Sequence, residues 1–397
     1  MSTRRNFLKQ TGAVLGYGSL FQAGIPLFAQ NTPANPSFSP STYMGAASLA
    51  ARAARTRLPY GCAVVPEMLN VEMDYTRTII EQCSILVAEN SMKWAAIHPQ
   101  PNTFNFAGAD KLLAFAGEHK MQLRGHNLCW HQALPSWFTK TMNRGNAKAM
   151  LVQHIQTVAG RYAGKLHSWD VVNEAIHVQD GRPDGLRKSP WLELIGEEYI
   201  DIAFHTARQA DPHALLTYND YGIEYDVPHD DQKRAAVLSL LRRMRKRKTP
   251  IDAVGVQSHL RAGTQDTIGD GLEHFLQEVR KLDLQVFITE MDVDDSHLTG
   301  DADQREAAVA AVYKQYFDLM LRDSQVTAAL TWGITNRYTW LNHEHPRKNG
   351  DYQVPLPFDS NYQPAKAFFA LGEAFGRRKV QSAAPVLTAK VNDAQAI

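Results

Sequence analysis

Two glutamates stand at the ends of apolar runs in this sequence. Glu174 closes the run 166–173, and Glu290 lies within the run 285–293. Runs of this kind, rich in Val and Ile, are typical of parallel strands that are covered on both faces. A single glutamate at a strand end is ordinarily a solvated side chain. Two of them brought to one rim would form the carboxylate pair that the hydrolysis of a glycoside requires.

Polar and aromatic residues end several other apolar runs. Side chains alternate along a strand, so Gln257 and His259 are expected to share one face, as are Glu290 and Asp292. Polar groups that face inward at the mouth of a barrel need partners, and a bound sugar supplies many hydroxyls. Tryptophans beside them offer flat apolar faces on which sugar rings stack. The full set is Glu89, Asn90, Lys93, Trp94, His126, Trp130, Asn219, Tyr221, Gln257, His259, Trp332 and Trp340.

Each of these residues, taken alone, also has an ordinary structural explanation as a core histidine, a core tryptophan or a helix cap. A metal site is a further alternative, formed from His126, His131 and the run 343–345. No pair among these residues has the i, i+4 spacing of helical metal ligands, and the run 343–345 lies in a loop rich in Pro, Gly and Asn. We therefore expect no metal and no other cofactor.

Eight predicted strands, alternating with helix-length amphipathic segments, must position these residues. One such segment, 190–209, has Ser189 as N-cap, Pro190 at its first position, and Asp211 with Pro212 as a stop. This alternation predicts an α/β fold, a (β/α)8 TIM barrel that forms a single catalytic domain. A doubly wound open sheet is the alternative, but no glycine-rich phosphate loop follows the first strand. The predicted strands span residues 60–65, 84–90, 122–130, 167–173, 215–221, 253–260, 286–293 and 328–334.

Length and composition limit the other classes of function. The chain has 397 residues, 44% of them hydrophobic, which is enough for one large core. Lys and Arg number 42 and Asp and Glu number 41, so the charge balance does not favour a nucleic-acid partner. The basic run 242–248 ends a helical pattern without interleaved aromatic residues, as a solvated helix C-terminus would. An odd set of three cysteines, Cys62, Cys83 and Cys129, indicates buried thiols rather than a disulfide framework.

A twin arginine, Arg4 and Arg5, precedes an apolar stretch rich in Gly and Ala that runs to about Ala29. This pattern resembles a twin-arginine export signal, while four glycines and Pro26 make the stretch a poor spanning helix. We expect export through the twin-arginine machinery to the periplasm or beyond, with no membrane anchor in the mature form. The predicted divisions are a signal peptide at 1–30, a linker and short lead-in helix at 31–58, the barrel at 59–376 and a polar tail at 377–397.

Six motifs follow one another along the predicted strands, at 89–94, 124–131, 169–175, 257–260, 288–293 and 331–333. In these motifs the chain resembles glycoside hydrolase family 10, whose characterised members are mostly endo-β-1,4-xylanases on a (β/α)8 barrel. The resemblance implies a monomeric, retaining endo-β-1,4-xylanase that acts on xylan or xylo-oligosaccharides. One alternative is a retaining β-glycosidase of the same family that acts on aryl or plant β-glycosides or on mixed-linkage glucan. Another is a non-catalytic xylan-binding barrel, which the intact catalytic motifs disfavour.

The resemblance also implies a role for each site residue. Glu174 would be the acid/base and Glu290 the nucleophile, while Asn173 would bond the 2-hydroxyl of the sugar at the cleavage point. These roles require Glu174 to be protonated and Glu290 to be ionised before the bond breaks. His259 would bond Glu290 and be held in turn by Asp292. The glycone side would be formed by Asn90, Lys93 and His126, and the walls by Trp94, Trp130, Trp332 and Trp340.

Four positions depart from the family pattern. After His131 the family usually has a small residue and then a glutamine that bonds sugar in the second glycone subsite, whereas this chain has Gln132 followed by Ala133. Asn336 stands where the family usually has aspartate, and Thr339 where it usually has serine. We expect these departures to affect substrate preference and not the catalytic pair.

Overall fold

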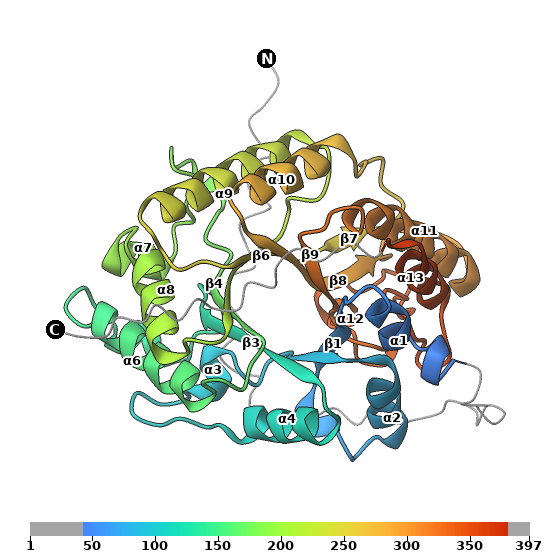
Figure 1. The fold of residues 1–397 in the computed structure, drawn as a ribbon, viewed down its shortest axis with the longest axis horizontal. Helices are drawn as coiled ribbons and strands as arrows, with labels where there is room; N and C mark the ends of the chain where they lie inside the picture. The colour runs from blue at the N-terminus through green and yellow to red at the C-terminus, as the bar shows by residue number, and fades with distance from the viewer. Residues whose placement is uncertain (1–42, 380–397) are drawn as a thin grey trace.

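A computed structural model describes residues 43–379 as a closed barrel of parallel strands ringed by helices (Figure 1). The strand order β6-β5-β4-β3-β2-β1-β9-β8 is closed by pairing between β6 and β8, and the short β7 pairs with β8 outside that closure. The predicted (β/α)8 barrel is confirmed. Its strands are β1 (Tyr60–Val64), β2 (Ile85–Ala88), β3 (Gln122–Cys129), β4 (Ser168–Asn173), β5 (Leu215–Asp220), β6 (Ala253–Val256), β7 (His259–Arg261), β8 (Gln285–Asp294) and β9 (Val326–Thr331).

Helices fill the connections between the strands. The α-helices are α1 (Leu49–Ala54), α2 (Met73–Gln82), α3 (Trp94–Ile97), α4 (Ala107–Glu118), α5 (Phe138–Thr141), α6 (Ala147–Arg161), α7 (Pro190–Ile195), α8 (Tyr199–Ala210), α9 (Pro228–Lys246), α10 (Asp270–Lys281), α11 (Ala302–Met320), α12 (Leu341–Glu344) and α13 (Lys366–Arg377). Short 3-10 helices lie at η2 (Gly45–Ala47), η3 (Pro66–Met68), η4 (Val178–Asp180) and η5 (Asn336–Tyr338). Across this described range, no helix combines the length and apolarity needed to cross a membrane.

Two predicted elements are divided in the structure. The predicted strand 253–260 breaks into β6 and β7 because Ser258 takes a left-handed φ of 67°, and its N–H donates to Glu224 Oε1 at 2.9 Å. The predicted helix 190–209 breaks into α7 and α8 at Gly196, whose φ of 93° cannot continue a helix. Its N-cap is as predicted, because the Ser189 side chain accepts from the N–H of Leu192.

The apolar residues form two cores, one on each face of the sheet. Successive residues of one strand point to opposite faces, so Ile85 and Val87 lie inside the barrel while Leu86 and Ala88 pack outward against the helices. The inner core is small, as expected for a barrel filled by a few layers of side chains. It consists of Ala63, Ile85, Val87, Ala253, Phe287, Ala328, Leu330 and Trp332.

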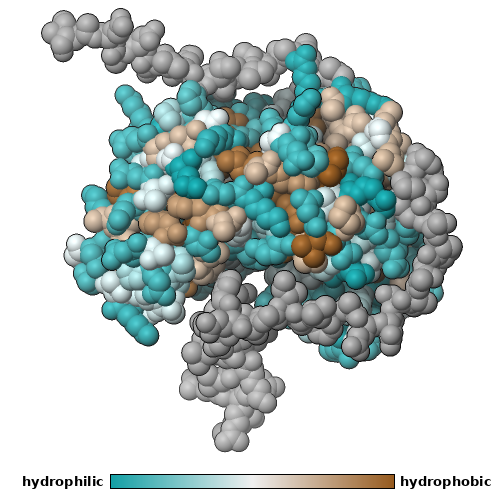
Figure 2. Space-filling model, turned by 90° about the horizontal axis from the view of Figure 1, so that it is seen from below, coloured by the Kyte–Doolittle hydropathy of each residue, from teal (hydrophilic) through white to brown (hydrophobic). Residues whose placement is uncertain are grey.

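The lead-in helix α1 packs against α13 on the outside of the barrel (Figure 1). This contact brings together the two ends of the described range. The guanidinium of Arg52 lies 5.9 Å from the ring centroid of Phe368, and the N–H of Leu49 donates to Gln82. On the face shown in Figure 2, polar residues surround apolar ones that gather in small groups. The predicted signal peptide at 1–30 and the tail beyond 379 lie outside the described residues.

Candidate active site

The two glutamates lie at the C-terminal mouth of the barrel on strands that do not pair with each other. Glu174 follows β4 directly and Glu290 lies in β8, with β5 and β6 between these strands. Glu174 has a left-handed φ of 58°, and its N–H donates to the carbonyl of Asn219 at 2.8 Å. A non-glycine residue in this region is strained and is held there by its surroundings, as residues at functional sites often are. Both side chains are more than nine-tenths buried.

Three side-chain amides connect the two carboxylates, and we call Asn173, Asn219 and Gln257 the amide bridge. Asn219 Nδ2 donates both to Asn173 Oδ1, at 2.9 Å, and to Glu290 Oε1, at 2.7 Å. Gln257 Nε2 donates to Glu174 Oε1 at 3.1 Å, and Asn173 Nδ2 reaches the same oxygen at 3.2 Å. The amide bridge therefore orients both carboxylates before a substrate arrives.

Glu290 is surrounded by groups that favour its charged form. His259 Nε2 lies 3.3 Å from Glu290 Oε2, and its Nδ1 lies 2.8 Å from Asp292 Oδ1. Burial opposes the charge of His259, but Asp292 and Glu290 outweigh it and raise the pKa of His259 well above its usual range. Burial likewise raises the pKa of Glu290, but His126, His259 and Lys93 outweigh it and bring that pKa to about 2. Glu290 is thus ionised at any moderate pH, as a nucleophile must be.

A buried charge network beneath Glu290 was not among the sequence predictions. Asp170 pairs with Arg124 and lies 3.0 Å from His126 Nδ1, and that nitrogen is 3.9 Å from Glu290 Oε1. A charged residue inside the apolar run of β4 was the available signal for Asp170. The ligand atoms of His126, Asp170 and Glu290 lie within 4.8 Å of one another, as in some metal sites. Arg124 already balances the charge of Asp170, so this set is suited to hydrogen bonding and not to holding a cation.

Glu174 has the opposite electrostatic environment. Burial raises the pKa of Glu174 and Asp220 adds to the effect, while the nearby N–H groups of Trp130 and Gln257 and the charge of Arg187 reduce it. The net shift is upward, which favours the protonated acid that bond cleavage needs. Arg187 Nε donates to the backbone carbonyl of Glu174 at 2.8 Å, and Arg187 Nη2 lies 4.0 Å from Glu174 Oε2.

One buried polar atom at this end of the cleft, His131 Nδ1, has no hydrogen-bond partner within the described part of the chain and lies 3.9 Å from Glu174 Oε2. A buried polar atom without a partner is unfavourable, so such an atom marks a place where a polar ligand can bind. Its position beside Glu174 is suited to a substrate that carries hydroxyl groups.

The half-buried Glu89 and Lys93, the exposed Asn90 and two indole rings line the side of the cleft after β2. Lys93 Nζ donates to Asn90 Oδ1 at 2.9 Å, and Asn90 Nδ2 donates to Glu89 Oε1 at 3.3 Å. Lys93 Nζ also lies 5.3 Å from the ring centroid of Trp130 and 5.7 Å from that of Trp332. This group combines hydroxyl-binding atoms with flat apolar faces, the composition expected of a sugar subsite.

Several residues predicted to contact sugar have other positions. Trp94 is wrong as a wall of the cleft: it is 1% exposed, donates to the carbonyl of Leu128 at 2.7 Å and stacks on His154. Asn219 is wrong as a sugar ligand because it is fully buried and both of its N–H groups bond other members of the site. Gln257 is 2% exposed and donates to Glu174, so it belongs to the amide bridge.

The remaining predicted residues lie around the cleft. Trp340 Nε1 donates to Asp292 Oδ2 at 2.7 Å, so this tryptophan supports the His259 pair and is also half-buried at the rim. Tyr221 accepts a hydrogen bond from Arg187 at 3.1 Å on the Glu174 side. His126 is 2% exposed and lies beside Glu290, so its contact with a sugar hydroxyl stays a prediction.

The departures from the family pattern have different structural roles. Ala133 has a left-handed φ of 49°, and its carbonyl accepts from Ala95 at 2.7 Å, while the neighbouring Gln132 is exposed. Asn336 is buried, and its Oδ1 accepts from the N–H of Leu356 at 2.9 Å, so it fixes a loop. Thr339 is also buried, and its Oγ1 accepts from the N–H of Leu341 at 3.3 Å. Among the four positions, the exposed Gln132 is therefore the side chain that can change its contacts most freely.

Comparisons with known proteins agree with this geometry. Residues 48–374 match the family described as glycosyl hydrolase family 10. The chain is 34% identical over 307 residues to a β-1,4-xylanase of Dictyoglomus thermophilum, covering 75% of this chain and 83% of that protein. It is similar to the crystal structure of xylanase 10B from Thermotoga maritima, with a TM-score of 0.76, 34% identity and coverage of 83% and 98%. It is also similar to xylanase 10B from Thermotoga petrophila in complex with xylobiose, with a TM-score of 0.74, 33% identity and coverage of 83% and 97%.

Proposed function

The chain belongs to glycosyl hydrolase family 10, and from that membership we propose that it is a retaining endo-β-1,4-xylanase that hydrolyses internal bonds of xylan by double displacement. The observation that carries the proposal is the pair of buried glutamates with opposite pKa shifts, joined by the amide bridge. Relatives named as xylanases at similar overall length support xylan as the substrate.

In the first step, Glu290 attacks the anomeric carbon while Glu174 donates its proton to the leaving glycosidic oxygen. The bond to the leaving sugar breaks, and a covalent glycosyl-enzyme forms on Glu290. In the second step, the ionised Glu174 takes a proton from water, whose oxygen attacks the same carbon and releases Glu290. Two inversions give net retention, and both residues return to their starting protonation states.

The anomeric form of the first product tests this mechanism. We expect proton NMR of fresh hydrolysate to show the β-anomer first, followed by slow mutarotation to the α-anomer. An α-anomer that appears first would mean inversion and would rule out the double displacement. Product analysis from decorated xylan reports in the same sample whether internal bonds are cleaved.

A second substrate class is favoured by one observation, the replacement of the usual subsite glutamine by Ala133. An enzyme with a weaker second glycone subsite gains less from long chains, which would favour short aryl or plant β-glycosides. Reducing-sugar assays on xylan, on cellulose derivatives and on aryl β-xylosides separate this possibility from the xylanase.

Export through the twin-arginine pathway and a monomeric mature enzyme are part of the proposal. Arg4 and Arg5, followed by a mildly apolar segment, support export. The variant with Arg4→Lys and Arg5→Lys should remain uncleaved and active in the cytoplasm, and unchanged export would remove the assignment. Light scattering of the purified enzyme tests the monomer.

A further inference from the structure

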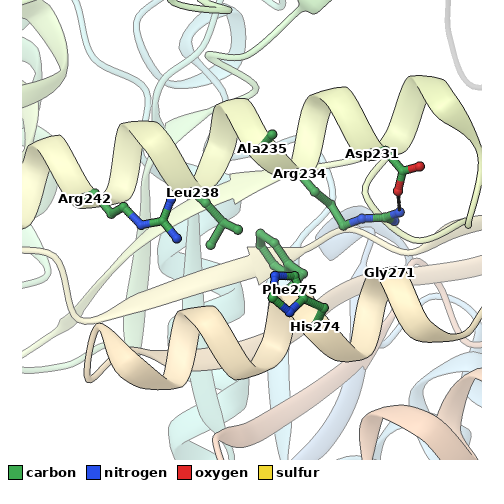
Figure 3. A pocket seen from close by; sticks show the side chains of 8 residues that line it. All are labelled: Asp231, Arg234, Ala235, Leu238, Arg242, Gly271, His274 and Phe275. Atoms are coloured by element: carbon green, nitrogen blue, oxygen red, sulfur yellow. Dashed lines mark hydrogen bonds and ion pairs between the residues drawn. The ribbon is translucent and has the colours of Figure 1, made fainter.

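Two neighbouring residues of α9, Lys233 and Arg234, contact different parts of the molecule. Arg234 lies at a groove of about 290 Å³ between α9 and α10, where it pairs with Asp231 (Figure 3). This groove is on the outside of the barrel. The preceding residue, Lys233, is 1% exposed and is directed instead toward the end of β5, behind the acid/base.

Lys233 is held by two residues at the end of β5. Its Nζ lies 2.7 Å from Asp220 Oδ1 and 3.6 Å from the ring centroid of Tyr221. Asp220 is fully buried, accepts from the hydroxyl of Tyr218 and also accepts from the N–H of Tyr221 at 3.0 Å. A buried cation over an aromatic face is a strong contact because neither group is screened by water. The pair therefore fixes both the backbone and the ring of Tyr221.

Tyr221 connects this ion pair to the acid/base. Its hydroxyl accepts from Arg187 Nη2 at 3.1 Å, and Arg187 Nε donates to the backbone carbonyl of Glu174 at 2.8 Å. The same Arg187 Nη2 lies 4.0 Å from Glu174 Oε2. Arg187 is in the loop after β4, where its backbone N–H donates to the carbonyl of Ala175 at 2.7 Å, and the hydroxyl of Tyr221 holds its guanidinium from the β5 side. A continuous set of contacts thus runs from α9 to the carboxyl group of Glu174.

We propose that Lys233 is a positioning residue for the acid/base Glu174, acting through Asp220, Tyr221 and Arg187. The inference rests on the proposed function, because it assumes that Glu174 protonates the leaving group. Lys233 is 1% exposed, so it acts from behind the cleft and not by contact with substrate. Its effect is to hold Arg187 and Glu174 in the geometry of proton transfer and to balance the charge of Asp220 close to the acid.

Loss of the charge of Lys233 should change the pKa of Glu174 in a definite direction. The charged groups that act on Glu174 are Lys93 after β2, Arg187 after β4 and Asp220 in β5. Burial lowers the pKa of His131, after β3, to about 3, so this residue is neutral. Removing a cation that offsets Asp220 leaves more negative charge near Glu174, so its proton is held more tightly and the pKa rises further. The charged and titratable groups around Lys233 itself are Asp220, Tyr221, Glu224 and His131, with His229 and Asp230 on its own helix.

The test compares substrates that differ in their need for protonation. In Lys233→Met we expect kcat/KM to fall about 10- to 100-fold on xylan, since general acid catalysis contributes about 10²- to 10⁴-fold and small misplacements are costly. On 2,4-dinitrophenyl β-xylobioside, whose leaving group needs little protonation, kcat/KM should fall less than about 3-fold. The alkaline limb of the xylan pH profile should move to higher pH. Equal losses on both substrates with an unmoved limb would overturn the inference.

Two further variants separate positioning from folding. Arg234→Met removes the adjacent buried cation, which bonds the carbonyls of Ile223 and Tyr225, so it should lower stability without changing the ratio of the two activities. Lys233→Met combined with Asp220→Asn removes both charges and should return the alkaline limb toward that of the parent enzyme. If the alkaline limb stays displaced in this double variant, the charge of Asp220 is not what raises the pKa of Glu174, and the inference is contradicted.

If Lys233→Met does not fold, Tyr221→Phe tests the same inference. It keeps the ring over Lys233 and removes only the acceptor of Arg187, so it should shift the substrate ratio in the same direction by a smaller factor. An unchanged ratio in this variant contradicts the inference. Failure of the parent enzyme on xylan would contradict the proposed function instead, and the dinitrophenyl substrate would still report on the Lys233 contacts.

Discussion

The two ends of the cleft hold the same type of residue in opposite states. Glu174 and Glu290 are 8% and 5% exposed, so burial alone would raise the pKa of both. The pKa of Glu174 does rise, whereas that of Glu290 falls to about 2. The difference comes from their neighbours and not from their burial. His126, at 3.9 Å, and the hydrogen-bonded His259, at 3.3 Å, stabilise the charge of Glu290. Arg187 lies 4.0 Å from the carboxylate of Glu174 and offsets its burial only in part.

The two ends also differ in what supports the neighbours. Around Glu290 the partners His259, Asp292 and Asn219 lie on strands. Around Glu174 the charged Arg187 and the neutral His131 lie on loops, whereas the charged Asp220 lies in β5. A nucleophile that must stay ionised is therefore held by the rigid barrel. An acid/base that changes protonation twice per turnover is adjusted by residues that depend on supports such as Tyr221.

The largest effect is expected from removing the nucleophile. Glu290→Ala should lower kcat by on the order of 10⁵-fold on every substrate, because loss of a nucleophile is not compensated by other groups. Turnover of 2,4-dinitrophenyl β-xylobioside measures it, and a circular dichroism spectrum matching the parent controls for folding. Appreciable turnover of that substrate by Glu290→Ala would show that Glu290 is not the nucleophile.

Removing the acid/base should have an effect that depends on the substrate. Glu174→Ala should lower kcat/KM on xylan by about 10²- to 10⁴-fold and affect dinitrophenyl glycosides much less, because only the former needs protonation. Added azide should react with the glycosyl-enzyme in the vacated space, giving β-glycosyl azide that NMR identifies. Uniform losses on both substrates, without azide product, would be the contrary outcome.

The low pKa of Glu290 predicts the direction of an acid-limb shift. His259→Ala removes a cation that favours the charged carboxylate, so the pKa of Glu290 rises from about 2 and the acid limb of kcat/KM moves to higher pH. A shift of about one pH unit or more is expected from loss of a close opposite charge. Trp340→Phe, which removes only the N–H bonded to Asp292, is the matched control and should shift the limb less. An acid limb at the parent position in His259→Ala would contradict this account of the nucleophile end.

The smallest effect is expected away from the catalytic pair. Ala133→Gln should raise kcat/KM on long xylan about 2- to 12-fold and leave aryl xylosides unchanged, since one neutral hydrogen bond is worth about 0.5–1.5 kcal/mol. Ala133 already has a left-handed φ with a Cβ present, so glutamine adds no new backbone strain. No gain here, together with a large loss in Gln132→Ala, would show that Gln132 already makes the contact.

The sequence alone was sufficient to predict the barrel and the meeting of Glu174 and Glu290 at its mouth. Both depend on local pattern: apolar runs alternate with amphipathic segments, and Glu174 and Glu290 each end or follow such a run. Because parallel strands of a barrel present their C-terminal ends at one mouth, two strand-end glutamates are brought together by the fold class itself. No exact contact was needed for that conclusion.

Only the tertiary structure decided which polar residues face the cleft and which support it. Trp94 and Asn219 carry the same strand-end signal as Trp130 and Lys93, yet they are buried against His154 and Glu290. Lys233, in a helix far from any motif, lies behind the acid/base. These outcomes depend on closure of the barrel, which places residues from β3, β4, β5 and β8 within hydrogen-bond distance across long separations in the chain. Local sequence pattern carries no record of such distances, so the partner of a buried polar group is known only once the strands are assembled.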